Sequence, residues 1–574
     1  MSDAIPEAPG LSRNERIKTA SNFLRGTIKE GLDAPLTGSI AEDDTQLTKF
    51  HGLYLQDDRD LRPERRKKRM EPAYAFMARV RLPGGVCTPD QWLRMDRIAT
   101  ELANGTLRLT TRQTWQFHGI IKQNLKSAFQ AIDRACLDTL AACGDVNRNV
   151  LASSNPELSR AHAAAADLAT RISTHLLPKT RAYREIWLDG ERVVGQDPVD
   201  DEPLYGRTYL PRKFKAVVAV PPDNDVDVFA HDLGFVAITG DGGEILGWNV
   251  TVGGGMGMTH GDTATYPRTA DVMAFCTPEQ AVDVAEQVVT VQRDFGDRKE
   301  RKHARLKYTI EARGLAWFRA EVERRLGYPL EDPRPMAFTH TGDRYGWRED
   351  HAGNWHYTLF VENGRVKDAP GQPMMTGLRE IARAHTGDFR LTANQNLMIA
   401  GVRPEDRGRI EGLLREHGLS NDGLSGLRRN AVACVALPTC GLSLAESERY
   451  LPTLVDALDE VLDEAGLRDD EIVIRMTGCP NGCARPYLAE IGLVGRGPGT
   501  YNLYLGAAFD GTRLNKLHRQ DVGHDAMVAE LRPLLHAYAK ERDDGERFGD
   551  FVIRRGVVAP TLKGPDFHDA VRLS

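Results

Sequence analysis

The sequence lacks the features that would place the chain in a membrane or on a nucleic acid. No apolar run approaches the length of about 20 residues that crosses a bilayer. The first 18 residues, MSDAIPEAPGLSRNERIK, contain no apolar core of a secretory signal. Lys plus Arg number 75 against 81 Asp plus Glu, which gives a net charge of −6. A dedicated nucleic-acid binder usually carries a basic excess, so that class is disfavoured.

Cysteine is also scarce, at eight residues in 574. In a long chain without a visible secretory signal, so few cysteines indicate a reducing cytoplasm rather than a disulfide framework. Four of them crowd into fifty residues, as Cys434, Cys440, Cys479 and Cys483. The others are scattered, and we expect them to be ordinary small core residues: Cys87, Cys136, Cys143 and Cys276.

The chain is too long for one ordinary core, and its composition of 41% hydrophobic and 27% charged residues is that of a globular protein. An internal repeat organises it. LRLTTRQTWQFHG (107–119) reappears as FRLTANQNLMIAG (389–401). Three more pairs of similar segments follow the same order: 74–85 with 354–365, 147–158 with 428–439, and 247–257 with 490–506. Four matches in register predict a duplicated α/β unit, whose pseudo-twofold halves could face each other across one site.

The first copy gathers cationic side chains. Strand side chains alternate between faces, so a strand over 107–118 would place Arg108, Arg112 and His118 together, opposite an apolar face. The same alternation pairs Lys213 with Lys215. Two further cations complete the set: Arg79, which shares a face with Arg81, and Arg148, in the NRN segment.

A lone Arg or Lys is more often a solvated surface residue, and a lone His is weak evidence of function. The second copy, however, has Asn394 in place of Arg112 and Ala400 in place of His118. The fold therefore does not require these cations. A polyanionic ligand would explain them, because Arg forks and Lys point charges bind carboxylates, phosphates and oxyanions.

The second copy carries the clustered cysteines instead, as C-x5-C and C-x3-C. Between the pairs, a helical pattern that ends at Gly466 precedes a buried strand at 471–478. A helix of about twenty residues rises roughly 30 Å, and eight strand residues return roughly 26 Å. The four thiols can therefore converge. Zinc prefers two to four residues within each pair, so the spacing favours an iron–sulfur cluster, whose cysteine ligands are often followed by Pro, as Cys479 is.

With TGCPNGC (477–483) and its upstream cysteine pair in place, the sequence resembles the sulfite and nitrite reductase superfamily, and within it the NADPH-dependent sulfite reductases. The resemblance runs from SNFLRGTI (21–28) through FHGLYLQDDRD (50–60) and TYLPRKFK (208–215) to GERFGDFVIRRG (545–556). It implies a 4Fe–4S cluster held by Cys434, Cys440, Cys479 and Cys483. It also implies siroheme, whose eight carboxylates supply the polyanion, with Cys483 as the axial ligand that joins the two centres.

The resemblance also assigns roles to the cations. Arg79, Arg148, Lys213 and Lys215 would be the catalytic, substrate-facing set. Arg108, Arg112 and His118 would bind siroheme. One departure stands out in the loop CGDVNRN: Gly144 replaces the Asn of closely related members, which puts the gating of this loop in question.

The implied fold class is α+β, with α/β parts, in a pseudo-twofold, three-domain arrangement with ferredoxin-like halves. We expect an N-terminal arm at 1–70 that could dock a flavoprotein, although its basic run RPERRKKR could equally be a solvated arm. The paired half-domains would be 71–140 and 345–416. A siroheme- and substrate-binding domain at 141–344 and a cysteine-bearing domain at 417–574 would complete the chain.

The implied activity is the six-electron reduction of sulfite to sulfide in the cytoplasm, within sulfate assimilation and cysteine biosynthesis. VGGGMG (252–257) is a weak dinucleotide signal, because neither a helix nor an acidic residue follows it as such sites require. The electrons must then come from a partner, an FAD- and FMN-containing flavoprotein alpha subunit that oxidises NADPH. Two alternatives remain open: a ferredoxin-dependent sulfite or nitrite reductase, and a non-catalytic protein with structural zinc.

Overall fold

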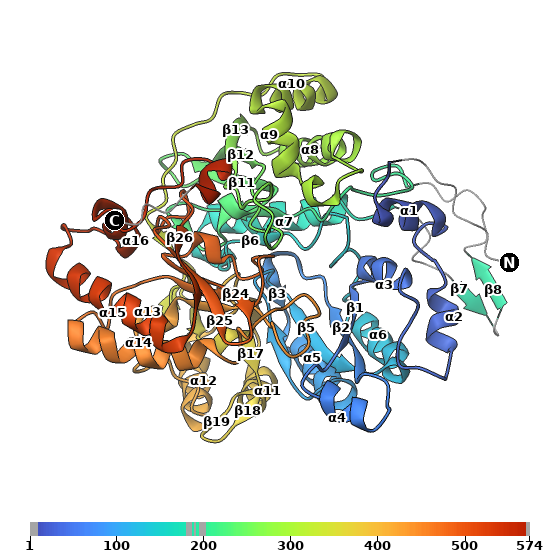
Figure 1. Ribbon diagram of the computed structural model, residues 1–574, viewed down its shortest axis with the longest axis horizontal. Coiled ribbons are helices and arrows are strands. Elements are labelled where there is room, and N and C mark those ends of the chain that lie inside the picture. Colours follow the sequence, from blue (N-terminus) through green and yellow to red (C-terminus); the bar gives the residue numbers. More distant parts are fainter. Residues whose placement is uncertain (1–9, 180–185, 189–190, 195–201, 570–574) are drawn as a thin grey trace.

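The computed structural model describes residues 10–179, 186–188, 191–194 and 202–569, and their elements gather into three regions (Figure 1). The first region contains two five-stranded sheets. One has the order β1 (Leu53–Asp57), β2 (Tyr74–Arg79), β5 (Trp115–Ile120), β4 (Leu107–Leu109) and β17 (Arg365–Val366). The other has the order β15 (Gly346–Glu349), β16 (Trp355–Leu359), β21 (Leu397–Val402), β20 (Asp388–Leu391) and β3 (Val86–Cys87).

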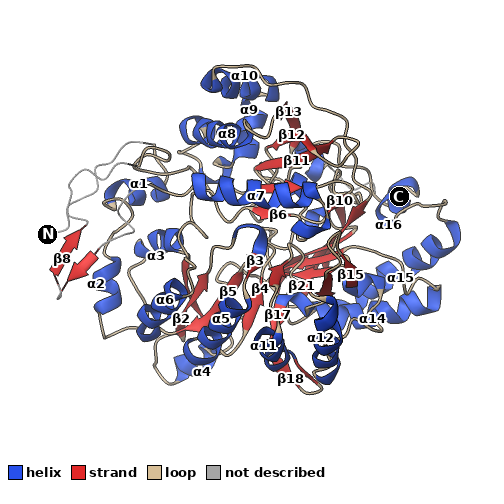
Figure 2. Ribbon diagram, turned by 180° about the vertical axis from the view of Figure 1, so that it is seen from behind, coloured by secondary structure: helices blue, strands red, loops and turns tan. Residues whose placement is uncertain are grey.

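The two sheets exchange their last strands. β3 follows β2 in the first copy but pairs with β20 of the second, and β17 of the second copy pairs with β4 of the first. Four helices pack on the same side of the two sheets (Figure 2): α5 (Pro89–Leu102), α6 (Leu125–Arg134), α11 (Met374–Ala384) and α12 (Pro404–Glu416). α5 begins with Pro89 behind a capping box, in which Thr88 and Gln91 each bond the other's backbone N–H.

Two matching glycines make the exchange possible. A Cβ on Gly85 would lie 2.4 Å from the carbonyl oxygen of Leu391, and one on Gly364 would lie 2.3 Å from that of Leu109. Both glycines have positive φ, 76° and 72°, in turns that lead into the exchanged strands. The close approach of the two halves is therefore built twice, once in each copy.

The segment 107–118 is a hairpin, so the predicted single strand is wrong. β4 and β5 flank a turn in which Gln113 has a φ of 52°, and Arg112 lies in this turn rather than on a strand face. The predicted apolar face is still present, because the odd-numbered residues of both strands point to the same side of the sheet. Four side chains on that side are fully buried: Leu107, Leu109, Trp115 and Phe117.

The second region is built on a mixed sheet with the order β13 (Asp271–Cys276), β12 (Ile245–Val252), β11 (Leu233–Thr239), β9 (Ala216–Ala219) and β6 (Leu151–Ala152). Its helices are α7 (Arg160–His175), α8 (Ala281–Phe295), α9 (Leu306–Arg313) and α10 (Leu315–Leu326). Apolar residues from α7, α8 and the sheet form its core. A two-stranded parallel pair, β10 (Asp223–Asn224) and β14 (His340–Thr341), lies where the chain leaves this region.

The third region carries the sheet β22 (Ala431–Ala433), β23 (Ile474–Thr477), β24 (Ile491–Gly497), β25 (Thr500–Leu505) and β26 (Lys516–Val522). Its helices are α13 (Gly426–Arg429), α14 (Leu451–Ala465), α15 (His524–Glu541) and α16 (Phe548–Arg554). α14 buries the predicted apolar stripe and ends at Gly466, whose φ of 71° closes the helix as expected. Two small hairpins complete the strands: β18 (Asp368–Ala369) with β19 (Gln372–Pro373), and β7 (Ile186–Leu188) with β8 (Glu191–Val194).

The N-terminal stretch is more ordered than a charged, irregular arm. It forms α1 (Arg13–Ala20), α2 (Ile28–Asp33), α3 (Asp44–Leu47) and α4 (Arg62–Lys67), and it supplies β1. Because β1 pairs with β2 along its whole length, a boundary at residue 70 divides the first sheet, and that part of the prediction is corrected. The predicted fold class, α+β with two ferredoxin-like halves, is confirmed. Among the described helices, none combines the length and apolar character needed to cross a membrane.

The exchange of strands makes a testable prediction. Gly364→Ala should lower the free energy of unfolding by about 2 kcal/mol beyond the cost of its positive φ, because the new methyl group meets backbone. Gly371→Ala is the matched control: it has a similar φ of 78° but no atom within 4 Å of its Cβ. Thermal unfolding of the two variants measures the difference. Equal shifts would contradict a tight approach of the two halves.

Candidate active site

The four clustered cysteines lie at one edge of the third sheet. β22 and β23 are parallel neighbours, and Cys434 follows the end of β22 directly, while Cys479 follows β23 by one intervening residue. Loops that leave parallel strands at their carboxyl ends emerge at the same edge. The Sγ atom of Cys434 accepts a hydrogen bond from the Gly478 N–H at 3.4 Å. The predicted convergence of the two pairs therefore has a structural basis.

Electrostatics shows the four thiols as one group. Burial, with neighbouring cysteines as a further cause, raises the pKa of Cys434, Cys440 and Cys479 to about 12 each. Cys483 contributes to the rise at all three positions and is itself exposed. Thiols with such pKa values stay protonated at neutral pH unless a metal displaces the proton.

The donor set fits a cluster better than a single ion. Across the described residues, no three His, Cys, Asp or Glu side chains lie close enough together to hold one metal ion. Mononuclear zinc would need four ligands at about 2.0–2.3 Å from one atom. Four thiols that interact without converging on a point suit a 4Fe–4S cluster, which binds one thiolate at each iron.

A cationic face stands opposite the cysteine loops. Arg108 on β4 is buried and donates to the carbonyl of Ala433, at 2.8 Å, and to Glu448. Arg365, on the exchanged strand β17, binds the same Glu448 carboxylate at 2.6 and 3.0 Å. Burial, with Arg365 as a second cause, lowers the pKa of Arg108 to about 9. The pair is thus held by one carboxylate from the cysteine-bearing region.

Arg112 projects from the β4–β5 turn into the second region. It donates to the Nδ1 atom of His231 at 3.2 Å and to the backbone carbonyl of Asn149. Its Nε atom is buried without a hydrogen-bond partner in the described part of the chain. Burial, then the neighbouring Arg148, lowers its pKa well below the ordinary value. Thr111, the residue before Arg112, donates from its hydroxyl to the backbone carbonyl of Cys483 at 3.1 Å. The turn therefore contacts both the second region and the cysteine-bearing region.

Arg79 and Arg148 meet around a thiol. Arg79, at the end of β2, donates to the Sγ atom of Cys143 at 3.2 Å. The Gln116 amide, oriented with its oxygen toward Arg79, accepts from the Nε atom at 3.2 Å. Arg148 donates twice to the carbonyl oxygen of Gly144, at 3.2 Å from each nitrogen. All these groups therefore belong to one polar cluster, with Cys143 inside it.

The loop departure at Gly144 has a steric reason. Its φ is 90°, and a Cβ would lie 2.9 Å from the ring of Phe50. A larger residue at this position would need Phe50 and the backbone to move. In this chain the loop instead packs beneath Phe50 and presents its carbonyl to Arg148.

Lys213 and Lys215 precede β9 rather than lying within it. Neither ammonium group has a hydrogen bond or ion pair with any residue that the structure describes. Burial, then Arg212, lowers the pKa of Lys213 to about 7. Burial, then Lys213, lowers the pKa of Lys215 well below its ordinary value. Burial and the neighbouring cations therefore disfavour the charged form of both amines.

His118 is buried on β5, with Nδ1 3.3 Å from the side-chain oxygen of Gln56 and Nε2 unpartnered in the described residues. Burial and the nearby arginines lower its pKa well below the ordinary value, so it is neutral. Arg81 forms an ion pair with Asp138 at 2.7 Å, and Val80 and Leu82, on the opposite parity, are buried. The predicted sharing of a face by Arg79 and Arg81 stays a prediction.

Several residues of the site escaped the sequence reasoning. Cys143 was expected to be a plain core residue, but it contacts Arg79; Cys136, also placed in the core, is exposed. Arg365 and Glu448 lie far from Arg108 in sequence. The strand exchange brings Arg365 beside it, and Glu448 reaches it from the cysteine-bearing region. Lys307 lies under the glycine-rich loop after β12, where it donates to the carbonyls of Gly255, Gly257 and Tyr266. The RKHARLKYT segment (301–309) gave only a basic composition as a signal.

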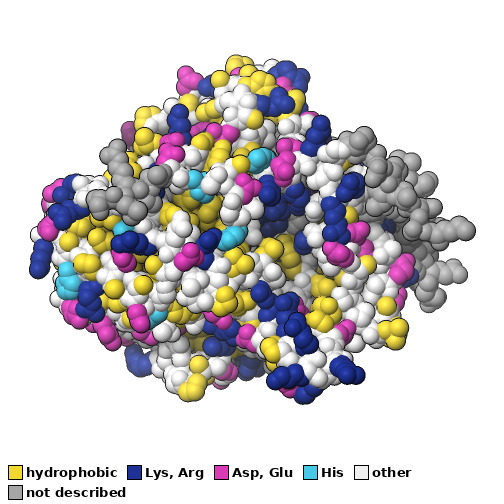
Figure 3. Space-filling model, viewed as in Figure 1, with side chains coloured by type: hydrophobic (Ala, Val, Ile, Leu, Met, Phe, Trp, Pro, Cys, Tyr) yellow, Lys and Arg dark blue, Asp and Glu magenta, His cyan; other side chains and the backbone are white. Residues whose placement is uncertain are grey.

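The face in Figure 3 has a hollow near its centre with Lys and Arg side chains gathered in it. The predicted cations are brought together, whereas the carboxylates near them are few and already bound. Asp145, for example, is held by Arg301 at 2.8 Å, by Lys18 at 3.6 Å and by Arg212 at 3.9 Å. The surplus of positive charge fits a polyanionic group such as a polycarboxylate tetrapyrrole.

The family model described as the nitrite/sulfite reductase ferredoxin-like half domain matches residues 68–135 and 348–417, and the nitrite and sulphite reductase 4Fe-4S domain matches 168–330. A sulfite reductase [NADPH] hemoprotein beta-component of Methylobacterium nodulans is 64% identical over 98% of this chain and 93% of its own length. One from Anoxybacillus flavithermus is 61% identical over 98% and 99%. The structure of the Mycobacterium tuberculosis NirA protein superposes with a TM-score of 0.77 at 27% identity, over 96% of this chain and 98% of that one.

These matches span both ferredoxin-like halves, the second region and nearly the whole sequence, and they agree with the cysteine and cation geometry. The chain therefore belongs to the nitrite and sulfite reductase family.

Proposed function

We propose that this chain reduces sulfite to hydrogen sulfide at a siroheme coupled to a 4Fe–4S cluster, within sulfate assimilation and cysteine biosynthesis. The observation that carries the proposal is the meeting of four thiols and a surplus of buried cations between the two copies. End-to-end similarity to sulfite reductase hemoproteins supports the choice of substrate. Ferredoxin-dependent sulfite or nitrite reduction is the alternative within the same fold.

The residues that would hold the two groups follow from their chemistry. Cys434, Cys440, Cys479 and Cys483 would bind the cluster, and Cys483, the exposed thiol, would also be the siroheme ligand. Arg108 and Arg112 are positioned to bind siroheme carboxylates, and His118 lies on the same face. When bound, the groups would supply an iron for the substrate and the stepwise electrons of a six-electron reduction.

The chain's own cations would bind and orient sulfite. Neither Lys213 nor Lys215 has an ion pair among the described residues, so a bound dianion would favour the charged form of both amines. Arg79 and Arg148 would complete the set of cations that face the substrate. Preorganised donors of this kind stabilise developing oxyanion charge. The pKa of Lys213, about 7, also lets its ammonium group give up a proton near neutral pH as an S–O bond breaks.

The electron donor is a separate protein in this proposal, namely an FAD- and FMN-containing flavoprotein that oxidises NADPH. The relatives' name, hemoprotein beta-component, implies an alpha component. The glycine-rich segment after β12 leads into a loop and packs against the cysteine loop, where Met258 N–H donates to the carbonyl of Pro480 at 3.0 Å. It is therefore unsuited to bind a dinucleotide. All eight cysteines are free thiols, which supports a reducing, cytoplasmic location.

A docking surface for the flavoprotein lies beside the cysteine loop. Arg59 donates to the carbonyl oxygens of Ser443, at 2.7 Å, and Cys440, at 3.4 Å, and so fixes the start of α4 against that loop. Leu442, next to Cys440, is 68% exposed, and Leu61 and Met70 at the two ends of α4 are also exposed. An exposed apolar patch at this place is suited to a protein contact near the cluster.

The α4 segment surrounds this patch with positive charge. Arg66, Lys67 and Arg69 are exposed and have no ion pair with the residues that the structure describes. Lys and Arg side chains gather there, at the lower edge of the face in Figure 3. A basic rim around an apolar centre fits a partner with an acidic face, as it steers encounter and fixes orientation. We assign that partner as the flavoprotein.

The function is tested by Lys215→Met in the holoenzyme. Turnover of sulfite should fall by about 10²–10³-fold, the typical loss when one preorganised oxyanion donor is removed. Cofactor content should stay near that of the parent, as measured by absorption and iron analysis. Lys367→Met, at an exposed site on the second copy, is the matched control. Unchanged sulfite turnover, or a preference for nitrite over sulfite in the parent protein, would contradict the proposal.

Cys483→Ser tests the junction between the two groups. We expect loss of the coupled siroheme–cluster spectrum, because a serine oxygen is a poor substitute for a bridging thiolate. The measurement is visible absorption together with electron paramagnetic resonance and iron content. Cys136→Ser, which changes an exposed thiol outside the site, should leave all three intact. A colourless parent protein with stoichiometric zinc would instead support the structural-zinc alternative.

The docking surface predicts a selective defect. Reversing Arg66, Lys67 and Arg69 to Glu should reduce NADPH-driven turnover with the flavoprotein on the order of tenfold at low salt. Turnover with a small reductant, reduced methyl viologen, should change less than about twofold, since no docking is needed. Reversal of Lys367, Arg383 and Arg409, exposed on the second copy, is the control. Equal losses with both electron sources would contradict a docking role for α4.

A further inference from the structure

The second copy contains a cavity at the place that corresponds to the catalytic site in the first. In the first sheet Arg79 of β2 pairs with Gln116 of β5; in the second sheet Thr358 of β16 pairs with Met398 of β21. The β4–β5 and β20–β21 hairpins have matching registers, with Gln116 opposite Arg108 and Met398 opposite Arg390. Thr358 and Met398 therefore take the positions of Arg79 and Gln116.

The outer strands extend this correspondence. The N–H of Arg79 donates to the carbonyl of Gly52, and Tyr54 lies two residues further along β1. Gly346 pairs with Thr358, and Arg348 lies two residues further along β15. Arg348 thus occupies the position of Tyr54. The face that holds the cations in the first copy has in the second two arginines, Arg348 and Arg390, a threonine and a methionine. Arg390 is held by Glu157 and by the side-chain oxygen of Asn155.

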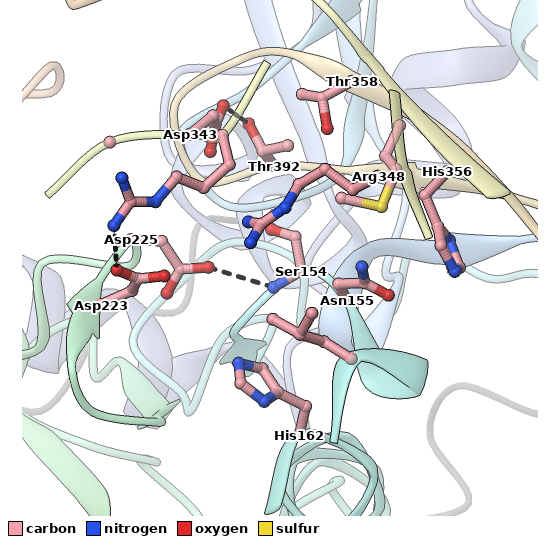
Figure 4. A pocket seen from close by; sticks show the side chains of 14 residues that line it. Ser154, Asn155, His162, Asp223, Asp225, Asp343, Arg348, His356, Thr358 and Thr392 are labelled. Carbon is pink, nitrogen blue, oxygen red and sulfur yellow. Dashed lines mark hydrogen bonds and ion pairs between the residues drawn. The ribbon is translucent and has the colours of Figure 1, made fainter. Parts of the chain in front are cut away.

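The cavity lies between this face and a segment of the second region, 154–162 (Figure 4). Its inner chamber has a volume of about 40 Å³. A larger vestibule of about 260 Å³ adjoins it and shares Asp343, Arg344 and Arg348. Arg429, from the end of α13, stands at the vestibule. The chamber has room for a few waters or a small ion, and the vestibule gives access to it.

The carboxylates that line the cavity are already satisfied. Asp225 accepts from Ser153 Oγ at 2.8 Å and from the Ser154 N–H at 3.1 Å. Asp343 accepts from three side chains of the β20–β21 turn, at 2.6 to 3.0 Å: Thr392, Asn394 and Asn396. Asp223 is paired with Arg344 at 2.9 Å. These groups do not call for a cation.

Several donors, in contrast, are unused. Within the described parts of the chain, no hydrogen bond or ion pair engages the guanidinium of Arg348, the Nδ2 of Asn155, the hydroxyl of Thr358 or the Nε2 of His162. Thr358 is 2% exposed, Asn155 8% and His162 9%, so three of the four lie in the interior and face the chamber. Arg348 is exposed, and the donor atoms of the other three open onto the chamber rather than being sealed in the core. A small acceptor in the chamber could therefore bind them.

We propose that this cavity is a second anion site, which binds a small tetrahedral oxyanion of the phosphate or sulfate class through Arg348, Asn155 and Thr358. Arg344 and Arg429 would attract the anion at the vestibule. The proposal does not depend on the catalytic assignment, because the cysteines and the counter-ion-free lysines lie at the other site.

Two features restrict the occupant. The chamber is too small for a second tetrapyrrole, and the segment facing it carries Ser153, Ser154 and Asn155 rather than cysteine. Burial, with Asp343 as a further cause, raises the pKa of Asp225 to about 7. Its negative charge therefore weakens as the pH falls through neutrality. Burial also raises the pKa of the neighbouring Asp343, and His162, with a pKa of about 4, stays neutral. Oxyanion affinity should rise over the same range.

The test is titration calorimetry of the holoenzyme with inorganic phosphate, and with sulfate in parallel, to distinguish the two sources of this chemistry. Lys215→Met serves as the background, because it weakens oxyanion binding at the catalytic site. One anion per chain should still bind, and Arg348→Leu should weaken that binding on the order of tenfold or more. Arg348→Lys should recover part of the loss.

Arg383→Leu, which removes an exposed arginine from α11, is the matched control and should leave the binding unchanged. Arg429→Leu gives an independent check at the vestibule and should weaken binding less than Arg348→Leu does. The proposal is overturned if neither anion binds at millimolar concentration in the Lys215→Met background, if Arg348→Leu and Arg383→Leu bind alike, or if the protein contains two sirohemes per chain.

Discussion

Positive charge enclosed between the three regions is the constraint on which the rest of the structure depends. Taking one guanidinium or ammonium group out of water is costly, and several side by side also repel one another. Lowered pKa values at Arg108, Arg112, Lys213 and Lys215 express that cost. Among the residues that the structure describes, the carboxylate bound to Arg108 is Glu448, which it shares with Arg365. The protein therefore holds a site that is stable in full only with a polyanion in it, so that cofactor binding and folding stability are linked.

The duplicated fold provides the rigidity that such a site requires. Each copy gives one edge strand to the other, and glycines at equivalent positions let the two backbones approach within contact distance. Cations on β4 and the β4–β5 turn are thereby held against backbone from both flanking regions, through Ala433 on one side and Asn149 on the other. One copy alone could not enclose these cations, because its sheet would lack the strand that the other copy supplies. The enclosed charge thus depends on the exchange.

The sequence predicted the four-thiol group, the cationic set and the duplication, because each is visible as residue identity at a fixed spacing. It did not predict the break of 107–118 into a hairpin. The odd-numbered residues face the same side of the sheet before and after the five-residue turn 110–114, so the alternation looks like that of one strand. Arg365 and Glu448 could not be found either. Strand exchange brings Arg365 beside Arg108, and Glu448 comes from the cysteine-bearing region, so no local pattern records either contact. Cys143 looked like a core residue because its importance comes from Arg79, 64 positions away. The identities of the candidate site residues could thus be predicted from the sequence, whereas the contacts between them could not.

The two copies have diverged in what they enclose rather than in how they are built. Register places Arg348 where the first copy has Tyr54, and Thr358 where it has Arg79, yet the turns, glycines and exchanged strands remain equivalent. The shared framework therefore does not determine which ligand binds. A few side chains on one face of each sheet determine it. Where those side chains are several cations opposite cysteines, the cavity suits a large redox group. Where they are Arg348, an ion-paired Arg390 and a few neutral donors opposite serine and asparagine, the same framework suits only a small anion.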